Sequence, residues 1–216
     1  MRKEERYKKI LDYFMEKQPA PETELLYASP YELIVAVILS AQCTDKRVNM
    51  ITPGLFLKYP DAYALAKADP EEVFEFIKSC SYPNNKSKHL VGMAKVLTGE
   101  FGGKVPADVD LLQKLPGVGR KTANVLASVI YDMPAIAVDT HVQRVSARIG
   151  LTRNAKTPLQ TEAQLVRHIP EDLLSRAHHW LILHGRYVCL ARKPKCYKCG
   201  IREYCRYYSE EQKENG

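Results

Sequence analysis

The sequence predicts an all-α protein. Apolar residues recur at helical spacing along nearly the whole chain of 216 residues. No segment shows the sustained alternation of apolar and polar residues that is typical of a half-buried strand. Residues that start helices, such as the pair Ser29-Pro30, precede several of the apolar patterns. We therefore expect helices joined by connections of ordinary length.

The first half of the chain begins with an amphipathic pattern at Ile10, Leu11 and Phe14, which a breaker stretch with two prolines ends. Ser29 and Thr44 are expected to cap the next two helices. Further helical patterns of this half run from about 70 to 79, from 85 to 101 and from 108 to 114.

The second half continues the helical periodicity with little interruption. Its patterns run from about 120 to 131, from 139 to 149, from 160 to 168 and from 171 to 189. The tail from 209 to 216 is polar, and we expect it to be frayed. Trp180 and the pair His178-His179 are interpreted as core and helix packing residues.

Charge is concentrated near the C-terminus. The whole chain has a formal net charge of +7, with Lys+Arg 32 and Asp+Glu 25. Residues 186 to 206 carry seven basic residues against the single acid Glu203, which gives +6 for this segment. Such a cluster of positive charges favours a polyanionic partner. No apolar run approaches the roughly 20 residues of a membrane helix, and the N-terminus does not resemble a secretory signal.

A glycine turn, Leu115-Pro116-Gly117-Val118-Gly119, separates a short helical pattern from a longer one. Glycines permit backbone conformations closed to other residues and let another molecule approach the main chain. The next helix is expected to begin at Gly119 or Arg120, so its unpaired N–H groups can hold a phosphate oxygen. A plain helix–turn–helix joint is the alternative. Arg120 and Lys121 directly follow the turn, and their positive charges favour a phosphate site over a plain joint.

Four cysteines near the C-terminus are spaced C-x6-C-x2-C-x5-C. Four thiols within seventeen residues indicate a metal site, and a cytosolic setting argues against structural disulfides. This spacing alone leaves a four-thiolate zinc site and a [4Fe-4S] cluster open. The four residues are Cys189, Cys196, Cys199 and Cys205. Cys43 and Cys80 fall outside the pattern and are interpreted as buried free thiols.

Several motifs in one order resemble the endonuclease III family of helix-hairpin-helix DNA glycosylases. They are LSAQCTD from 39, LPGVGRKTAN from 115, AVDTHVQR from 137, HHWLILHGRYVC from 178 and the cysteine pattern. The resemblance extends from about 33 to 205. It implies a bifunctional DNA glycosylase and AP lyase of base excision repair that removes oxidised pyrimidines, and it selects the [4Fe-4S] cluster over zinc.

The resemblance also implies the catalytic residues. Lys121 would attack C1′ of a damaged nucleotide and form a Schiff base, after which β-elimination cuts the strand. Asp139 would assist deprotonation of the lysine and stabilise positive charge on the sugar. From its position before a helix, Asp139 is also expected to be an N-cap, and the two roles are compatible. His141 is expected to pack or to form hydrogen bonds.

DNA contacts are expected from several parts of the chain. Gln42 matches the family residue that fills the space left by the extruded base. The family has a second residue of this kind, a second wedge, which is usually leucine. Alignment on Lys86 places Tyr82 at that position, so Tyr82 is the candidate for the second wedge. The remaining expected contacts are Gly117, Gly119, Arg120, Arg192, Lys193 and Lys195.

The motifs admit two rival functions. An adenine-removing glycosylase of the same fold would lack the catalytic lysine and use a carboxylate on an early helix, yet residues 33 to 43 contain no Asp or Glu. A non-catalytic DNA-binding protein would use the hairpin only to hold phosphates. In that case Lys121 and Asp139 would have no chemical role.

The expected architecture is two helical domains with a DNA-binding cleft between them. By resemblance, residues 23–133 form a domain with the hairpin, and residues 1–22 and 134–216 form a second domain with the cluster. The best boundary candidate in the sequence is Met133-Pro134. The expected partner of this monomer is double-stranded DNA with damaged bases or abasic sites. The expected location is the bacterial or archaeal cytosol, on the nucleoid, without a membrane.

Overall fold

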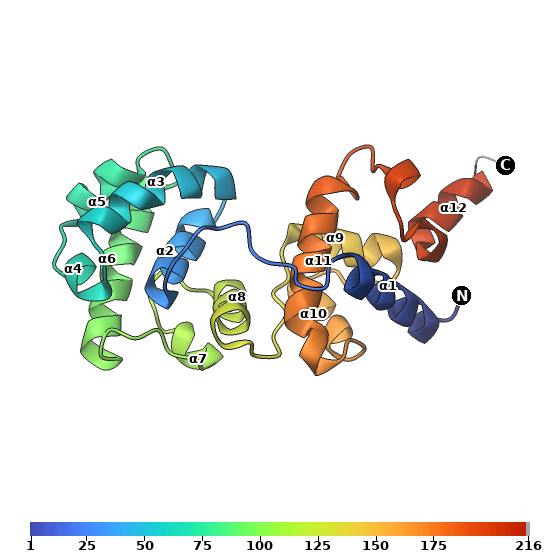
Figure 1. The fold of residues 1–216 in the computed structure, drawn as a ribbon, viewed down its shortest axis with the longest axis horizontal. Helices are drawn as coiled ribbons and strands as arrows, with labels where there is room; N and C mark the ends of the chain where they lie inside the picture. Colours follow the sequence, from blue (N-terminus) through green and yellow to red (C-terminus); the bar gives the residue numbers. More distant parts are fainter. Residues whose placement is uncertain (215–216) are drawn as a thin grey trace. The chain divides into compact units, whose positions relative to one another are not determined.

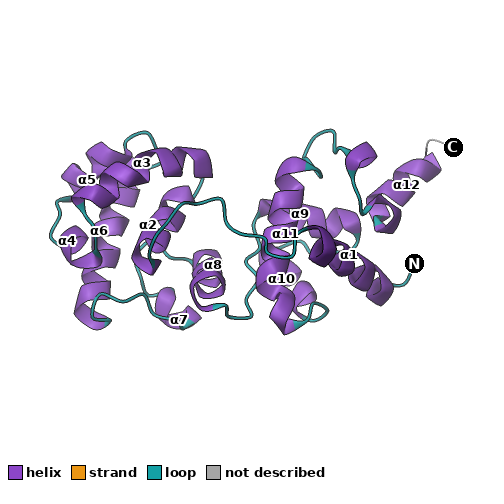
Figure 2. Ribbon diagram, in the orientation of Figure 1, coloured by secondary structure: helices purple, strands orange, loops and turns teal. Residues whose placement is uncertain are grey.

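The computed structural model of the chain describes residues 1–214, with side chains described through Glu210. In this part of the chain the regular elements are all helices, and no strand occurs (Figure 2). The predicted all-α fold is therefore confirmed. Residues 215 and 216, the last two of the expected frayed tail, lie outside the described residues.

The chain divides into two compact units, which are described separately. One unit is Thr23–Asp132, and the other combines Met1–Glu22 with Met133–Gly216. The chain therefore leaves the second unit after its first helix and returns to it after residue 132. The boundary in the structure lies one residue before the Met133-Pro134 bond.

The unit Thr23–Asp132 is built around α2 (Pro30–Ser40). All the residues of this helix from Leu33 to Leu39 are buried, because other helices cover it on several sides. Three of them, α3 (Asp45–Lys58), α6 (Pro83–Glu100) and α8 (Arg120–Tyr131), pack directly against it (Figure 1). The shorter helices α4 (Ala62–Ala66) and α5 (Pro70–Ile77) pack on α6, and α7 (Val109–Leu112) packs on α8.

The predicted caps of α2 and α3 are present. The Ser29 hydroxyl accepts a hydrogen bond from the Glu32 N–H at 3.2 Å, and the Glu32 carboxylate accepts one from the Ala28 N–H at 2.7 Å. The Thr44 hydroxyl accepts from the Arg47 N–H at 3.3 Å. Each such cap stabilises a helix by about 1 kcal/mol. Glu32 is thus a capping carboxylate at the start of the buried helix.

The second unit consists of helices that gather around α11. Its α-helices are α1 (Lys3–Lys17), α9 (Thr140–Ile149), α10 (Pro158–Val166), α11 (Leu174–Tyr187) and α12 (Arg206–Glu214). Its 3-10 helices are η1 (Glu171–Leu173), η2 (Cys196–Lys198) and η3 (Arg202–Tyr204). Helix α9 packs against α11 and α12, and α1 packs against η3 (Figure 1).

Trp180 is the centre of the core of this second unit. It is fully buried, and its ring stacks on Phe14 with centroids 5.7 Å apart and planes 12° apart. Its Nε1–H donates to the Gln18 carbonyl at 2.7 Å, so its polar atom is satisfied. His178 Nδ1 lies 2.7 Å from the Ala137 carbonyl oxygen. The packing roles predicted for these residues are confirmed.

Two helices were not expected from the sequence. Helix α4 has only five residues, too few for a periodic pattern, although Asp61 caps it by accepting from the Ala64 N–H at 2.8 Å. The tail predicted to be frayed from 209 is helical through Glu214. Arg206, its first residue, donates to the Ala147 carbonyl at 3.0 Å and so ties the helix to α9. Tertiary contacts therefore stabilise a segment that has little apolar periodicity of its own.

None of the helices within residues 1–214 is both long enough and apolar enough to cross a bilayer.

The buried imidazole of His179 makes the stability of the second unit depend on pH. Burial, with the nearby charge of Arg186, lowers the pKa of His179 from its ordinary 6.5 to about 4. The unfolded chain binds a proton near pH 6.5 and the folded chain does not, so stability falls as the pH drops from 6.5 towards 4.

The prediction is that wild-type protein loses about 2–3 kcal/mol from this group over that pH range, and that His179→Leu lacks this component. Thermal or urea denaturation of both proteins at several pH values measures the difference. Parallel pH dependence in the two proteins would contradict the assignment.

Candidate functional site

The glycine turn before α8 has one position that only glycine fits. Gly117 has φ +82°, a left-handed conformation, and a Cβ there would lie 3.0 Å from the His89 Cβ and 3.3 Å from the Ile38 Cγ2. Gly119 differs from the expectation, because its φ of −88° is open to any residue. Among the described residues, a Cβ on Gly119 would meet no atom within 4 Å. Its small size therefore leaves an open approach to the main chain.

Helix α8 begins directly after this turn, as predicted. Gly119 is its N-cap and has no side chain to accept the first N–H groups. Backbone N–H groups at a helix start have no partner inside the helix and carry the positive end of the helix dipole. Arg120 and Lys121 are the first two residues of the helix, and both are exposed. This end of α8 combines backbone donors with two cationic side chains, and one of them, Lys121, carries an amine that can act as a nucleophile.

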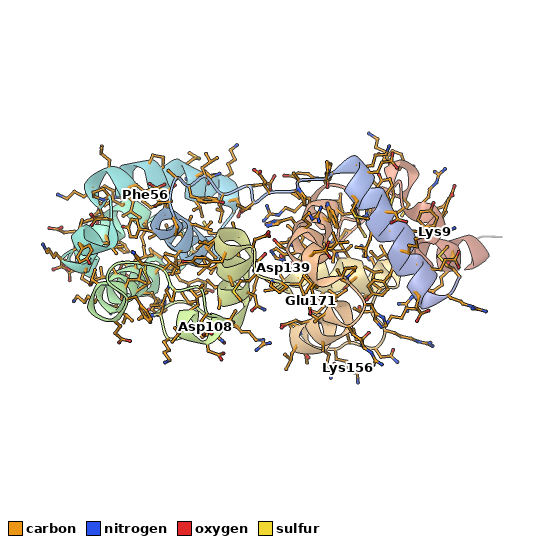
Figure 3. The ribbon with its side chains drawn as sticks, turned by 60° about the horizontal axis from the view of Figure 1, so that its bottom comes forward. Lys9, Phe56, Asp108, Asp139, Lys156 and Glu171 are labelled. Carbon is orange, nitrogen blue, oxygen red and sulfur yellow. The ribbon has the colours of Figure 1, made fainter. Side chains whose placement is uncertain are left out.

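Asp139 is the N-cap of α9, as predicted (Figure 3). One carboxylate oxygen accepts from the Val142 N–H at 2.8 Å, and the other lies 3.0 Å from His141 Nδ1. Only 14% of the Asp139 side chain is exposed, against 32% for His141. Both carboxylate oxygens are thereby held in fixed directions. His141 was expected to pack or hydrogen-bond, and here it orients the carboxylate.

The four C-terminal cysteines line one small pocket in the second unit. Cys189 lies two residues after α11, Cys196 begins η2, and Cys199 and Cys205 directly follow η2 and η3. The remaining lining includes Ile149, His184 and Tyr208. All four thiols are free, and within the described residues no three Cys, His, Asp or Glu side chains are grouped closely enough to hold a single ion. The fold therefore places the four thiols of the cysteine pattern around one shared pocket.

The surroundings of these thiols are apolar with a few directed donors. Burial raises the pKa of Cys199 to about 11 and also raises that of Cys205. Arg148 Nη1 points at the Cys189 sulfur from 3.8 Å, and His184 Nε2 lies 3.7 Å from the Cys199 sulfur. Burial lowers the pKa of His184 to about 4, which keeps it neutral. Such a site favours thiolates only when a metal replaces their protons.

Two arginines of α9 hold the loop that begins this cysteine segment. Arg144 donates to the carbonyls of Gly185 and Cys189 at 2.9 and 3.1 Å. Arg148 donates to the carbonyls of Leu190 and Ala191 at 2.6 and 2.8 Å. The loop therefore has a defined path.

The basic residues expected to contact DNA lie on that loop. Arg192 and Lys193 are exposed, whereas Lys195 is half-buried. Lys193 has φ +50°, and the N–H of Lys195 donates back to the Val188 carbonyl at 2.9 Å. These contacts fix the backbone from which the three cationic side chains extend.

The two expected wedge residues lie on neighbouring loops of the other unit. Gln42 and Tyr82 are both exposed, and both have a left-handed backbone, with φ 54° and 55°. The Ser81 hydroxyl donates to the Gln42 carbonyl at 2.6 Å and joins the loops. The structure thus brings together two candidates that are forty residues apart in sequence.

Lys86 joins these two loops through its side chain. Its side chain is buried, and its Nζ donates to the carbonyls of Leu39 and Ala41, both at 2.7 Å. Burial lowers the pKa of this amine. A lone lysine near the start of a helix gives no sequence signal of such a role, because its acceptors are more than forty residues away.

Cys43 and Cys80 were expected to be buried free thiols. Cys80 is buried, but Cys43 is partly exposed, and the two sulfurs are 3.5 Å apart. The expectation is therefore wrong for the burial of Cys43. The contact between the two residues was not foreseen, because they are 37 positions apart.

Comparison with known proteins places these features in a family. Residues 35–171 match the model of the HhH-GPD superfamily base excision DNA repair protein. The chain is 47% identical over 201 residues to a Rickettsia felis protein named endonuclease III, which covers 93% of this chain and 94% of that protein. It is 46% identical over 196 residues to the Bacillus subtilis protein of the same name, with 91% and 90% covered.

Solved structures give the same result. A trapped endonuclease III–DNA covalent intermediate superposes with a TM-score of 0.91 at 40% sequence identity. The match covers 98% of this chain and 100% of that protein.

Substitution of Gly117 tests the turn. Gly117→Ala is expected to lower the free energy of unfolding by about 2 kcal/mol, because alanine disfavours a left-handed backbone and its Cβ crowds His89. Gly99→Ala on α6 is the matched control. Its Cβ meets no described atom within 4 Å, and alanine in a helix is neutral or stabilising by about 0.5–1 kcal/mol.

Urea denaturation measures both changes. Equal stability of Gly117→Ala and wild type would show that the turn does not require glycine.

Proposed function

The chain belongs to the endonuclease III family and is a bifunctional DNA glycosylase and AP lyase of base excision repair, and from this premise we propose that Lys121 is its nucleophile. The observation that carries the proposal is the position of Lys121 in the first turn of α8, directly after the glycine turn. The relative that was trapped covalently on DNA supports a covalent step in this chain as well.

The proposed substrate is double-stranded DNA with an oxidised pyrimidine or an abasic site. The Lys121 amine attacks C1′, so that a C–N bond forms while the bond to the base breaks and the base leaves. The sugar ring opens as the imine forms. The imine acidifies C2′, loss of a proton there breaks the C3′–O bond, and the strand is cut by β-elimination. Hydrolysis of the imine releases Lys121.

Asp139 is proposed as the carboxylate that assists this chemistry. It would accept the proton from the attacking amine and stabilise positive charge on the sugar as the base departs. Its oxygens are held by the Val142 N–H and by His141, so the carboxylate keeps one orientation without reorganisation. A negative charge is also stabilised at the start of α9 by the helix dipole.

DNA binding is proposed to use the chain's exposed cations and helix ends. The open main chain at Gly117 to Gly119 and the side chain of Arg120 would hold phosphate oxygens. The loop side chains of Arg192, Lys193 and Lys195 would follow the phosphate backbone, and binding should weaken steeply as salt rises. Gln42 is proposed to fill the space of the extruded base, and Tyr82 to stack beside it.

The resident cofactor is proposed to be a [4Fe-4S] cluster. Four thiols line one shared pocket, and membership of the endonuclease III family favours a cluster over a single zinc ion. Cys189, Cys196, Cys199 and Cys205 would hold it, and Arg148 and His184 would lie beside two of the sulfurs. The cluster would supply a rigid link between α11 and the C-terminal segment. We propose that the protein acts as a monomer on DNA in the cytosol.

An adenine-type glycosylase has less support than the lyase. The single acid of α2 is Glu32, and its carboxylate accepts the Ala28 N–H as part of a helix cap. The non-catalytic alternative gives Asp139 only its role as the N-cap of α9 and leaves the orientation of its second oxygen by His141 without a chemical purpose.

The lyase proposal is tested by trapping. Wild-type protein with borohydride and an abasic-site duplex should give a covalent adduct, and Lys121→Gln should give none while it still binds the duplex. Lys121 is exposed, so the variant is expected to fold. No adduct with wild-type protein, or an adduct with Lys121→Gln, would refute the assigned nucleophile.

A second variant separates the carboxylate from the nucleophile. Asparagine keeps an oxygen that can accept the Val142 N–H, so Asp139→Asn should preserve the cap of α9. Its rate of base removal is expected to fall about 10²–10⁴-fold. Single-turnover kinetics on an oxidised-pyrimidine duplex measures it, and an unchanged rate would rule out the role of Asp139.

Metal analysis tests the cofactor. The purified wild-type chain is expected to contain about four iron and four sulfide ions, and Cys199→Ser is expected to lose them. Cys43→Ser should keep the full content, because Cys43 lies in the other unit. Zinc in place of iron would favour the alternative that the spacing left open.

A further inference from the structure

Cys43 and Cys80 form a thiol pair that neither the repair chemistry nor the cysteine cavity uses. Their sulfurs are 3.5 Å apart, within one compact unit. Cys43 follows the end of α2, and Cys80 precedes α6. Both are free cysteines.

These two thiols lie at the junction of the loops that carry Gln42 and Tyr82. Gln42 is adjacent to Cys43, and Tyr82 is two residues after Cys80. The loops are also joined by the hydrogen bond from Ser81 to the Gln42 carbonyl and by Lys86, which binds the Ala41 carbonyl. A covalent bond between the two sulfurs would therefore link the two backbone segments next to the wedge candidates.

The backbone at Gln42 and Tyr82 is held in a state that neither residue prefers. A left-handed conformation is unfavourable for a non-glycine residue, so surrounding contacts must maintain it. The thiol pair, Ser81 and Lys86 are the described contacts that join the two loops. Movement of these loops would release the strained conformations.

The environment of the two thiols suits oxidation. Cys43 is partly exposed and can be reached by a small oxidant, whereas Cys80 is 5% exposed. Burial raises the pKa of Cys80 to about 11, and the positive charges of Lys86 and Arg47 act in the opposite direction. Cys43 is thus the accessible thiol, and Cys80 lies in position to react second.

We propose that Cys43 and Cys80 are a modification site at which a peroxide forms a reversible disulfide, and that this disulfide weakens the binding of damaged DNA. The effect on DNA rests on the proposed function of Gln42 and Tyr82. Formation of the bond does not depend on that function.

The reaction is balanced by hydrogen peroxide as the oxidant. The Cys43 sulfur attacks one peroxide oxygen, the O–O bond breaks, and a sulfenic acid and one water form. The Cys80 sulfur then attacks the Cys43 sulfur, the S–O bond breaks, and a second water leaves. Two thiols and one peroxide give one disulfide and two waters, and a dithiol reductant reverses the change by exchange.

The geometry explains why such a bond would matter. A disulfide bond is about 2.05 Å long, so the sulfurs must approach each other by roughly 1.5 Å. The bond would also fix the separation of the loops bearing Gln42 and Tyr82, because each cysteine lies within two residues of a wedge candidate. A displacement of about 1 Å is enough to spoil the fit of a positioned side chain.

The test compares wild type with Cys43→Ser before and after treatment with hydrogen peroxide. The probe is a duplex with a tetrahydrofuran abasic-site analogue, which binds without being cut. Peptide mapping without reductant should show Cys43 joined to Cys80 in wild type. Binding of the oxidised wild type should be about tenfold weaker, and dithiothreitol should restore it.

Cys43→Ser serves as the matched control. It cannot form the bond, so peroxide should leave its DNA affinity unchanged, whereas damage at the other four cysteines would weaken both proteins equally. Cys80→Ala should behave in the same way and guards against a folding defect in one variant.

Two results would overturn the proposal. One is the absence of the joined peptides under conditions that oxidise other thiols of the chain. The other is a joined pair with unaltered affinity for the probe. Failure of the reduced protein to be trapped by borohydride would instead count against the proposed lyase function, and the peptide map would remain interpretable.

Discussion

The candidate site depends on how the unpaired backbone N–H groups at the N-termini of α8 and α9 find partners. A helix start leaves backbone N–H groups without partners inside the helix, and these groups must meet a side chain, water or a ligand. At α9 the carboxylate of Asp139 takes this place, and His141 holds its second oxygen. At α8 the N-cap is Gly119, which offers no side chain. The same physical requirement thus orients the carboxylate that we propose for catalysis on one helix and leaves the proposed phosphate site on the other.

The C-terminal segment depends on a related requirement, the pairing of loop carbonyls. Arg144 and Arg148 extend from α9 and donate to four carbonyls between Gly185 and Ala191. Guanidinium groups suit this task because their fixed donors reach several acceptors at once. Close packing also fixes the chain at Gly200, because a Cβ there would overlap the ring of Tyr13 from α1. Contacts with α9 and α1 therefore define the path of the cysteine segment.

Much of the local structure follows from short-range rules in the sequence. Ser29, Thr44 and Asp139 were expected as caps, and each accepts the backbone N–H three residues later. Helix α8 begins and ends where its apolar pattern predicts. The short α4 and the polar α12 escaped prediction because contacts with other parts of the chain stabilise them. Gly119 was expected to need glycine for its backbone, yet only Gly117 does.

The sequence by itself determined the helical class, the helix starts and the chemical groups offered for catalysis, because periodicity, caps and residue types are local properties. The tertiary structure decided which distant groups meet. It placed Cys43 against Cys80, joined the loops of Gln42 and Tyr82 through Ser81 and Lys86, and gathered four thiols around one cavity. Such contacts arise when helices pack around α2 and α11. Spacing along the chain does not encode the distance between residues on different helices.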